Sequence, residues 1–180
     1  DLRQVNKRAL SGDLARYAGN TALRPIEEAL IERYRRSDIP IVFIVGVPRS
    51  GTTLLYQLMV RHLRMGYVNN YMARFWMAPI VGAIAYRLLH GSEDASIPLK
   101  SHLGGTPTPA SPHEFSWFWE YWTEFGDIDD HPEHRLRSMQ WGPIRRELEG
   151  LAGYFDAPLV LKSINYVNYH IDWIDRLLPE

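Results

Sequence analysis

Apolar residues along the chain form short continuous runs separated by segments with helical spacing. The run at residues 39–45, Ile-Pro-Ile-Val-Phe-Ile-Val, is β-branched and aromatic and predicts a strand buried on both faces. Runs at 158–162 and 66–69 predict two further strands. Strands that alternate with helices predict an α/β fold, a P-loop-like parallel sheet flanked by helices. We expect an N-terminal helical extension over residues 1–38 and the α/β unit over 39–180.

Helical spacing of apolar residues predicts the elements between the strands. Asn20 is a potential helix cap and Pro25 suits a first helical turn, so we expect one helix over residues 1–18 and a second ending near Arg36. Residues 91–112 are rich in Ser, Pro, Gly and Thr without periodicity and predict a long loop. Further helices are expected at 52–65, 73–89, 115–125, 132–155 with an interruption at 142–143, and 167–178.

Composition and charge argue against several classes of protein. The 20 basic and 21 acidic residues give a net charge of -1, without the basic excess of a nucleic-acid-binding protein, so we expect no nucleic-acid partner. The longest apolar stretch, residues 75–86, is shorter than the roughly 20 residues of a bilayer span. The chain has no cysteine, which fits a reducing cytoplasm, and we expect it there.

The most specific signal is the segment 46–53, Gly-Val-Pro-Arg-Ser-Gly-Thr-Thr, between a predicted strand and a predicted helix. In this context backbone N–H groups at the helix N-terminus bind an oxyanion, and glycine permits a positive φ and a close approach to the ligand. A nucleotide triphosphatase has Lys directly after the second Gly, where this chain has Thr52. The cation here is inside the loop, at Arg49.

Residues 48–55 resemble the 5′-phosphosulfate loop of sulfotransferases that use 3′-phosphoadenosine 5′-phosphosulfate (PAPS), in the Arg form typical of the tyrosylprotein and bacterial branches. Residues 158–163, Pro-Leu-Val-Leu-Lys-Ser, with the predicted helix that follows them and ends at Leu177-Leu178-Pro179, resemble a second motif of that family. The resemblance implies transfer of a sulfuryl group from PAPS to a hydroxyl or amine of a small-molecule acceptor, without a metal. It also implies that the donor is held by Pro48, Arg49, Ser50, Gly51, Thr52 and Thr53.

Sulfuryl transfer requires cations where negative charge grows on the leaving phosphate. Arg49 can serve as an electrostatic clamp but not as a proton donor, because its guanidinium does not give up a proton. By the resemblance, Lys162 is a second cation near the transferred sulfonate. Taken alone, a Lys at a strand end reaches solvent, so this assignment depends on the loop.

The acceptor also requires a base, and both positions where relatives carry one are empty. Residues 66–74 contain no carboxylate, and Ile164 stands where another branch has His. His113 and Glu114, which precede a predicted helix, are the replacement candidates. The other interpretation is that Glu114 is a charge favoured by the helix dipole and that His113 is exposed.

Two further clusters fit structural roles better than functional ones. Seven of the eleven residues at 115–125 are aromatic, and their helical spacing favours core packing over an acceptor pocket. The Asp, Glu and His residues at 127–134 also fit a loop and a helix start, so we expect no metal site.

The sequence alone leaves two other functions open. A P-loop kinase or nucleotide hydrolase is disfavoured by Thr52, and a catalytically inactive nucleotide-binding module is favoured by the empty base positions. A relative would continue after Glu180 with an Arg and a Ser that bind the 3′-phosphate of the donor. We therefore expect this chain to be the N-terminal part of a longer enzyme and not to be active alone.

Overall fold

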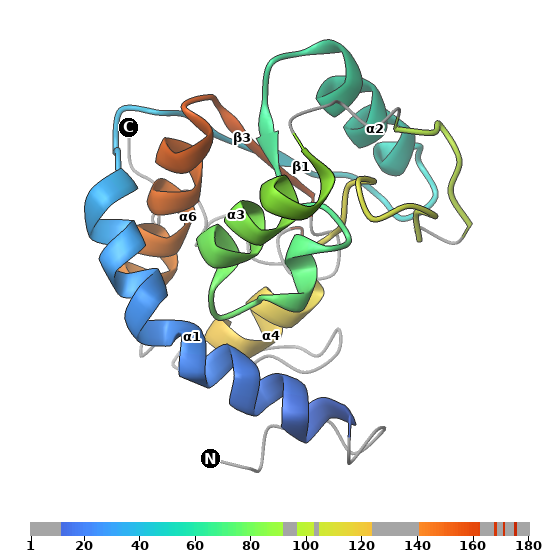
Figure 1. Cartoon of the computed structure of the whole chain (residues 1–180). Coiled ribbons are helices and arrows are strands. Elements are labelled where there is room, and N and C mark those ends of the chain that lie inside the picture. The colour runs from blue at the N-terminus through green and yellow to red at the C-terminus, as the bar shows by residue number, and fades with distance from the viewer. Residues whose placement is uncertain are drawn as a thin grey trace.

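The structure is a computed structural model that describes residues 12–91, 97–102, 105–123 and 141–162, with residues 168, 171 and 175. Helices surround a small parallel sheet, which confirms the predicted α/β class (Figure 1). In chain order the elements are α1 (Gly12–Tyr34), β1 (Ile41–Ile44), α2 (Thr52–His62), β2 (Gly66–Tyr67), the 3-10 helix η2 (Met72–Arg74), α3 (Pro79–His90), α4 (Ser116–Thr123), α6 (Trp141–Phe155) and β3 (Leu159–Lys162).

The sheet has the order β1-β3-β2, and both pairs are parallel. Ile41 pairs with Leu159 and Ile44 with Lys162, while Gly66 of β2 also pairs with Leu159. The last strand in the sequence is therefore the central one, and all of its residues are buried. The prediction that the first strand is buried on both faces is wrong. Among the described strands β1 has one neighbour only, so three of its four residues are half-buried.

Alternation along the strands divides the core between the two faces of the sheet. Leu161 packs into the larger core with α3, α4 and α6, whereas Ile44 and Val160 pack with Tyr56 of α2 on the other face. Lys162 follows Val160 by two residues, so its side chain lies on the α2 face as well. The alternation of side chains along β3 thus places Lys162 on the face of the sheet that α2, the helix after the phosphate loop, covers.

The N-terminal helix is longer than the sequence predicts. We expected a break near Asn20, but α1 is continuous from Gly12 to Tyr34 and contains Pro25. The Asn20 carboxamide does not cap a helix; it accepts from Met77 N at 3.0 Å and donates to Arg74 O at 3.0 Å. These contacts with a distant segment outweigh the local capping preference of asparagine.

The helix boundaries after β2 also differ from the expected ones. Instead of one helix over 73–89, the short η2 precedes α3, and Pro79 is in the first turn of α3, where a missing N–H costs nothing. Gly142 and Pro143 lie at the start of α6. Most of the helix expected at 167–178 and of the segment before α6 lies outside the described residues.

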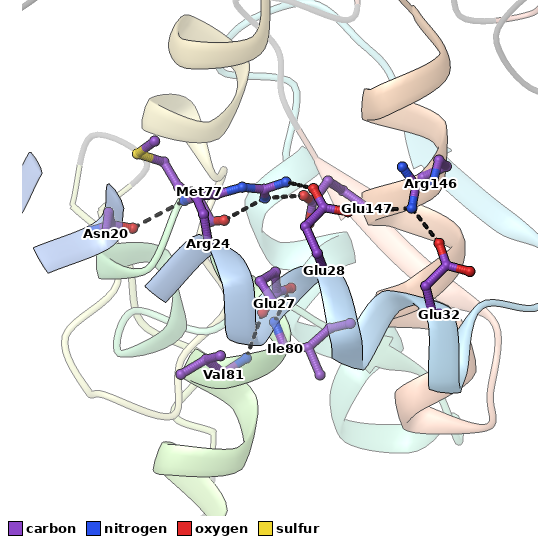
Figure 2. Close-up of polar contacts among 10 residues, drawn as sticks. All are labelled: Asn20, Arg24, Glu27, Glu28, Glu32, Met77, Ile80, Val81, Arg146 and Glu147. Carbon is purple, nitrogen blue, oxygen red and sulfur yellow. Dashed lines mark hydrogen bonds and ion pairs between the residues drawn. The ribbon is translucent and has the colours of Figure 1, made fainter. Parts of the chain in front are cut away.

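The aromatic helix α4 belongs to the core, as its spacing predicted. Phe118 and Trp119 are buried, together with Phe115 just before the helix. The α1 and α6 helices lie side by side over this core, with α3 packed against both (Figure 1). Figure 2 shows the polar side chains that join α1 to α6 and to the start of α3.

Candidate active site

The predicted phosphate loop connects β1 to α2, at the carboxyl end of the sheet. It turns through a hydrogen bond from Ser50 N to Val47 O of 3.1 Å, and Gly51 has φ +90° directly before the helix. A side chain with a Cβ disfavours that conformation, so glycine is required at this position. Leu55 N donates to Gly51 O at 3.0 Å, and no side chain caps the N-terminus of α2. The first N–H groups of the helix remain without a side-chain cap.

Arg49 is at the exposed tip of this loop and has φ +70°. Positive φ is uncommon outside glycine and costs about 1–3 kcal/mol, so it persists only where surrounding contacts enforce it. Among the described residues, no hydrogen bond or ion pair joins the Arg49 guanidinium to another side chain. The guanidinium can therefore turn toward an anion at the helix N-terminus without breaking an existing contact.

Lys162 joins the loop to the candidate base. Its side chain is buried, and its Nζ donates to Thr53 Oγ1 at 3.1 Å and forms an ion pair with the Glu114 carboxylate. The three residues are far apart in the sequence, and β3, α2 and the segment before α4 bring them together. Glu114 is partly accessible, with 26% of its side chain exposed. This group therefore combines a buried cation, a loop hydroxyl and a carboxylate that solvent can reach.

His113 is anchored beside Glu114. Its backbone N donates to Val68 O at 2.9 Å, and its ring Nδ1 accepts from Phe115 N at 2.8 Å. Burial lowers the pKa of His113, and the neighbouring Glu114 carboxylate opposes this shift only in part. A neutral ring that accepts at Nδ1 carries its proton on Nε2. In this tautomer His113 is a hydrogen-bond donor and not a base.

Phe115, which follows Glu114, is a second residue with positive φ, at +59°. Its ring is buried and stacks on Phe118 with centroids 4.5 Å apart. For a bulky residue this backbone conformation is a true outlier, and such outliers cluster at functional sites. Two of the three described non-glycine residues with positive φ, Arg49 and Phe115, are thus close in sequence to Thr53 and Glu114, the partners of Lys162. The third is Asp156, which follows α6.

The first glycine of the loop has a partner that sequence reasoning missed. The peptide of Gly46 donates to Asn168 Oδ1 at 3.1 Å, and Asn168 Nδ2 donates back to Gly46 O. A Cβ at Gly46 would lie 2.9 Å from Thr52 Cγ2, so the backbone here is in close contact with the loop. Asn168 lies in the part of the second motif that is predicted to be helical, but asparagine is not one of the residues that define that motif, so the sequence contains no signal for it.

Two further features that the sequence raised are a metal site and a membrane span. Among the described residues, no three His, Asp or Glu side chains gather as metal ligands, and the cluster expected at 127–134 lies outside them. Within the same part of the chain, no helix is both long and apolar enough to cross a bilayer.

A family model described as "Sulfotransferase family" matches residues 40–180, from the start of β1 onward. The chain belongs to the sulfotransferase family. No curated protein and no solved structure gives a significant match to it. The reaction class of this sulfotransferase is therefore the transfer of a sulfuryl group, and the matched range includes both sequence motifs.

Proposed function

We propose that this sulfotransferase takes the sulfuryl group from PAPS and that residues 48–53 bind the 5′-phosphosulfate. The observation that carries the proposal is the contact of buried Lys162 with Thr53 Oγ1 at 3.1 Å. It sets a second cation beside a loop that already offers Arg49 and an uncapped helix N-terminus. Backbone N–H groups, the helix dipole and two cations together form a site for a dianionic group.

The proposed chemistry follows from this charge distribution. The acceptor oxygen or nitrogen attacks sulfur while the bond from sulfur to the bridging phosphate oxygen breaks, and the electron pair of that bond stays on the phosphate. Arg49 stabilises the growing charge on the phosphate, and Lys162 contacts the oxygens of the transferred group. Arg in the loop also fits the bacterial and tyrosylprotein branches of the family.

Glu114 is the proposed base, with His113 as the less favoured candidate. The carboxylate is partly exposed and contacts Lys162, whereas the Nδ1 of His113 is occupied by the N–H of Phe115. Without donor, Glu114 neutralises Lys162, because an unpaired buried cation costs several kcal/mol. When donor oxygens accept from Lys162 instead, Glu114 loses that partner and becomes free to take the acceptor proton.

Binding of adenosine 3′,5′-bisphosphate, measured by calorimetry, tests the donor site. We expect Arg49→Ala to weaken binding about tenfold or more, since a hydrogen bond to a charged group contributes about 1.5–3 kcal/mol. Arg61→Ala is the matched control, because Arg61 is an exposed arginine in the last turn of α2. Equal affinities of the wild-type chain and the Arg49 variant would reject the loop assignment, and magnesium-dependent ATP hydrolysis would favour a kinase or hydrolase.

A further inference from the structure

We infer that Asn168 is a positioning residue of the phosphate loop, whose carboxamide fixes the backbone N–H and C=O of Gly46, and with them the two peptide groups that flank this residue, in the orientation that anion binding requires. Oδ1 of Asn168 accepts from Gly46 N at 3.1 Å, and its Nδ2 donates to Gly46 O. The inference rests on the proposed function, because it assigns a purpose to the geometry of the proposed donor loop.

Gly46 lies beyond the strand ladder and requires another partner. The last paired residues of β1 and β3 are Ile44 and Lys162, so the peptide of Gly46 has no partner in the described sheet. A half-buried peptide that lacks partners is unfavourable. A carboxamide supplies one acceptor and one donor in the geometry of a peptide, which a carboxylate or a hydroxyl does not. The side chain of Asn168 thus supplies Gly46 with the two hydrogen bonds that a neighbouring strand would otherwise provide.

The orientation of Gly46 determines the base of the loop. A Cβ at Gly46 would lie 2.9 Å from Thr52 Cγ2 and 3.2 Å from Ser50 Oγ, so its backbone packs against residues proposed to bind the donor. At the other end, Gly51 is held by the N–H of Leu55. With both ends fixed, the strained conformation of Arg49 between them is enforced. Without the carboxamide, the loop gains alternative conformations and binding requires their loss.

The test is the affinity for adenosine 3′,5′-bisphosphate of the Asn168→Ala and Asn168→Asp chains. We expect Asn168→Ala to weaken binding about tenfold, and Asn168→Asp to weaken it further, since aspartate cannot donate to Gly46 O and adds negative charge near the anion. In turnover by the longer enzyme that we expect to contain this chain, the donor KM should rise more than the acceptor KM. Asn168→Gln, which keeps the carboxamide on a longer side chain, should recover part of the affinity.

Asn20→Ala is the matched control for a structural asparagine. Asn20 also accepts from a backbone N–H and donates to a backbone carbonyl, but it joins α1 to the segment before α3, away from the loop. We expect a lower Tm for Asn20→Ala with unchanged nucleotide affinity. If Asn168→Ala fails to fold, the nearly isosteric Asn168→Asp gives the same comparison.

The outcomes separate this inference from the proposed function. If the wild-type chain binds the nucleotide, Arg49→Ala loses affinity and both Asn168 variants keep full affinity and donor KM, the positioning role is rejected while the donor site stands. If the wild-type chain and Arg49→Ala do not differ, the donor site itself is rejected. Loss of affinity at Asn168 but not at Asn20 supports the inference.

Discussion

Two regions of the molecule hold a cation against carboxylates, and they differ in how many partners the cation has. Between α1 and α6, Arg24 donates to Met77 O at 2.7 Å and pairs with Glu147 and Glu28 (Figure 2). Its guanidinium also lies over the ring of Trp122, 5.2 Å from the ring centroid. Beside the phosphate loop, Lys162 has one carboxylate and one hydroxyl. Among the described residues, the Arg24 side chain, 19% exposed, has contacts from four segments, while the Lys162 side chain, 1% exposed, has two polar partners and lies next to the phosphate loop.

The carboxylates differ in the same way. Glu27 caps the start of α3 by accepting from Ile80 N and Val81 N at 2.9 Å each, and Glu147 is 1% exposed. Glu114 is 26% exposed and has one charged partner. A network in which each charged group has several partners fixes helices relative to one another, whereas a pair with fewer partners can exchange one of them for a ligand. This difference is our reason for treating the Lys162 group as reactive and the Arg24 group as structural.

The largest effect should come from the carboxylate beside Lys162. Glu114→Gln keeps the shape and still accepts from Lys162 but cannot take a proton. In the longer enzyme that we expect to contain this chain, turnover should therefore fall about 10²–10⁴-fold. Nucleotide affinity should change little. The comparison is His113→Gln, which should keep turnover within about tenfold, because the ring positions the backbone and does not accept a proton. Full activity of Glu114→Gln together with an inactive His113→Gln would reverse the assignment of the base.

A smaller effect is expected in the network around Arg24 and Glu147. Its contribution to the free energy of unfolding should depend on pH. Burial raises the pKa of Glu27 to about 7 and that of Glu147 to about 8. Among the described residues, Glu147 Oε2 is a buried oxygen without a hydrogen-bond partner, and a proton retained there could be donated to Glu27. The folded chain then binds protons more tightly than the unfolded chain, whose carboxyl groups titrate near 4.5.

The sign of the stability change follows from this linkage. Stability from the retained proton is complete below pH 4.5 and is lost as the pH rises through about 7 to 8. In Glu147→Gln, whose amide mimics the neutral acid, we expect this loss, on the order of 2 kcal/mol, to disappear. The measurement is the difference between the two chains in free energy of unfolding from pH 5 to pH 8. A constant difference across that range would show that the proton is not retained.

Local patterns identified the parts of the candidate site that depend on neighbours in the sequence, and their roles stay predictions. The segment 46–53 and the strand ending at Lys162 carry their own signals, and Glu114 was found as a carboxylate near a helix start. Asn168 was missed because its partner Gly46 is 122 residues away and no local pattern joins them. Half-burial of β1 was missed for a related reason, since strand order decides which strand is central.

The N-terminal helix illustrates the same limit of local reasoning. Asn20 and Pro25 are common at helix starts, and read alone they divide α1 in two. In the structure the helix continues, because packing on α3 and α6 and the contacts of Arg24 with distant segments hold it together. Glu147, the principal partner of Arg24, is 123 residues away. Its burial depends on this distant contact, so the residues next to it in the sequence do not predict it.

A crystal structure of the chain with PAPS tests the central claim most directly. We predict the 5′-phosphate at the N-terminus of α2, within hydrogen-bond distance of backbone N–H groups of residues 50–53, with Arg49 turned toward it and Lys162 Nζ in contact with the ligand. Glu114 should then have fewer contacts with Lys162 than in the free chain. Nucleotide bound away from this loop, with the pair of Lys162 and Glu114 unchanged, would contradict the account.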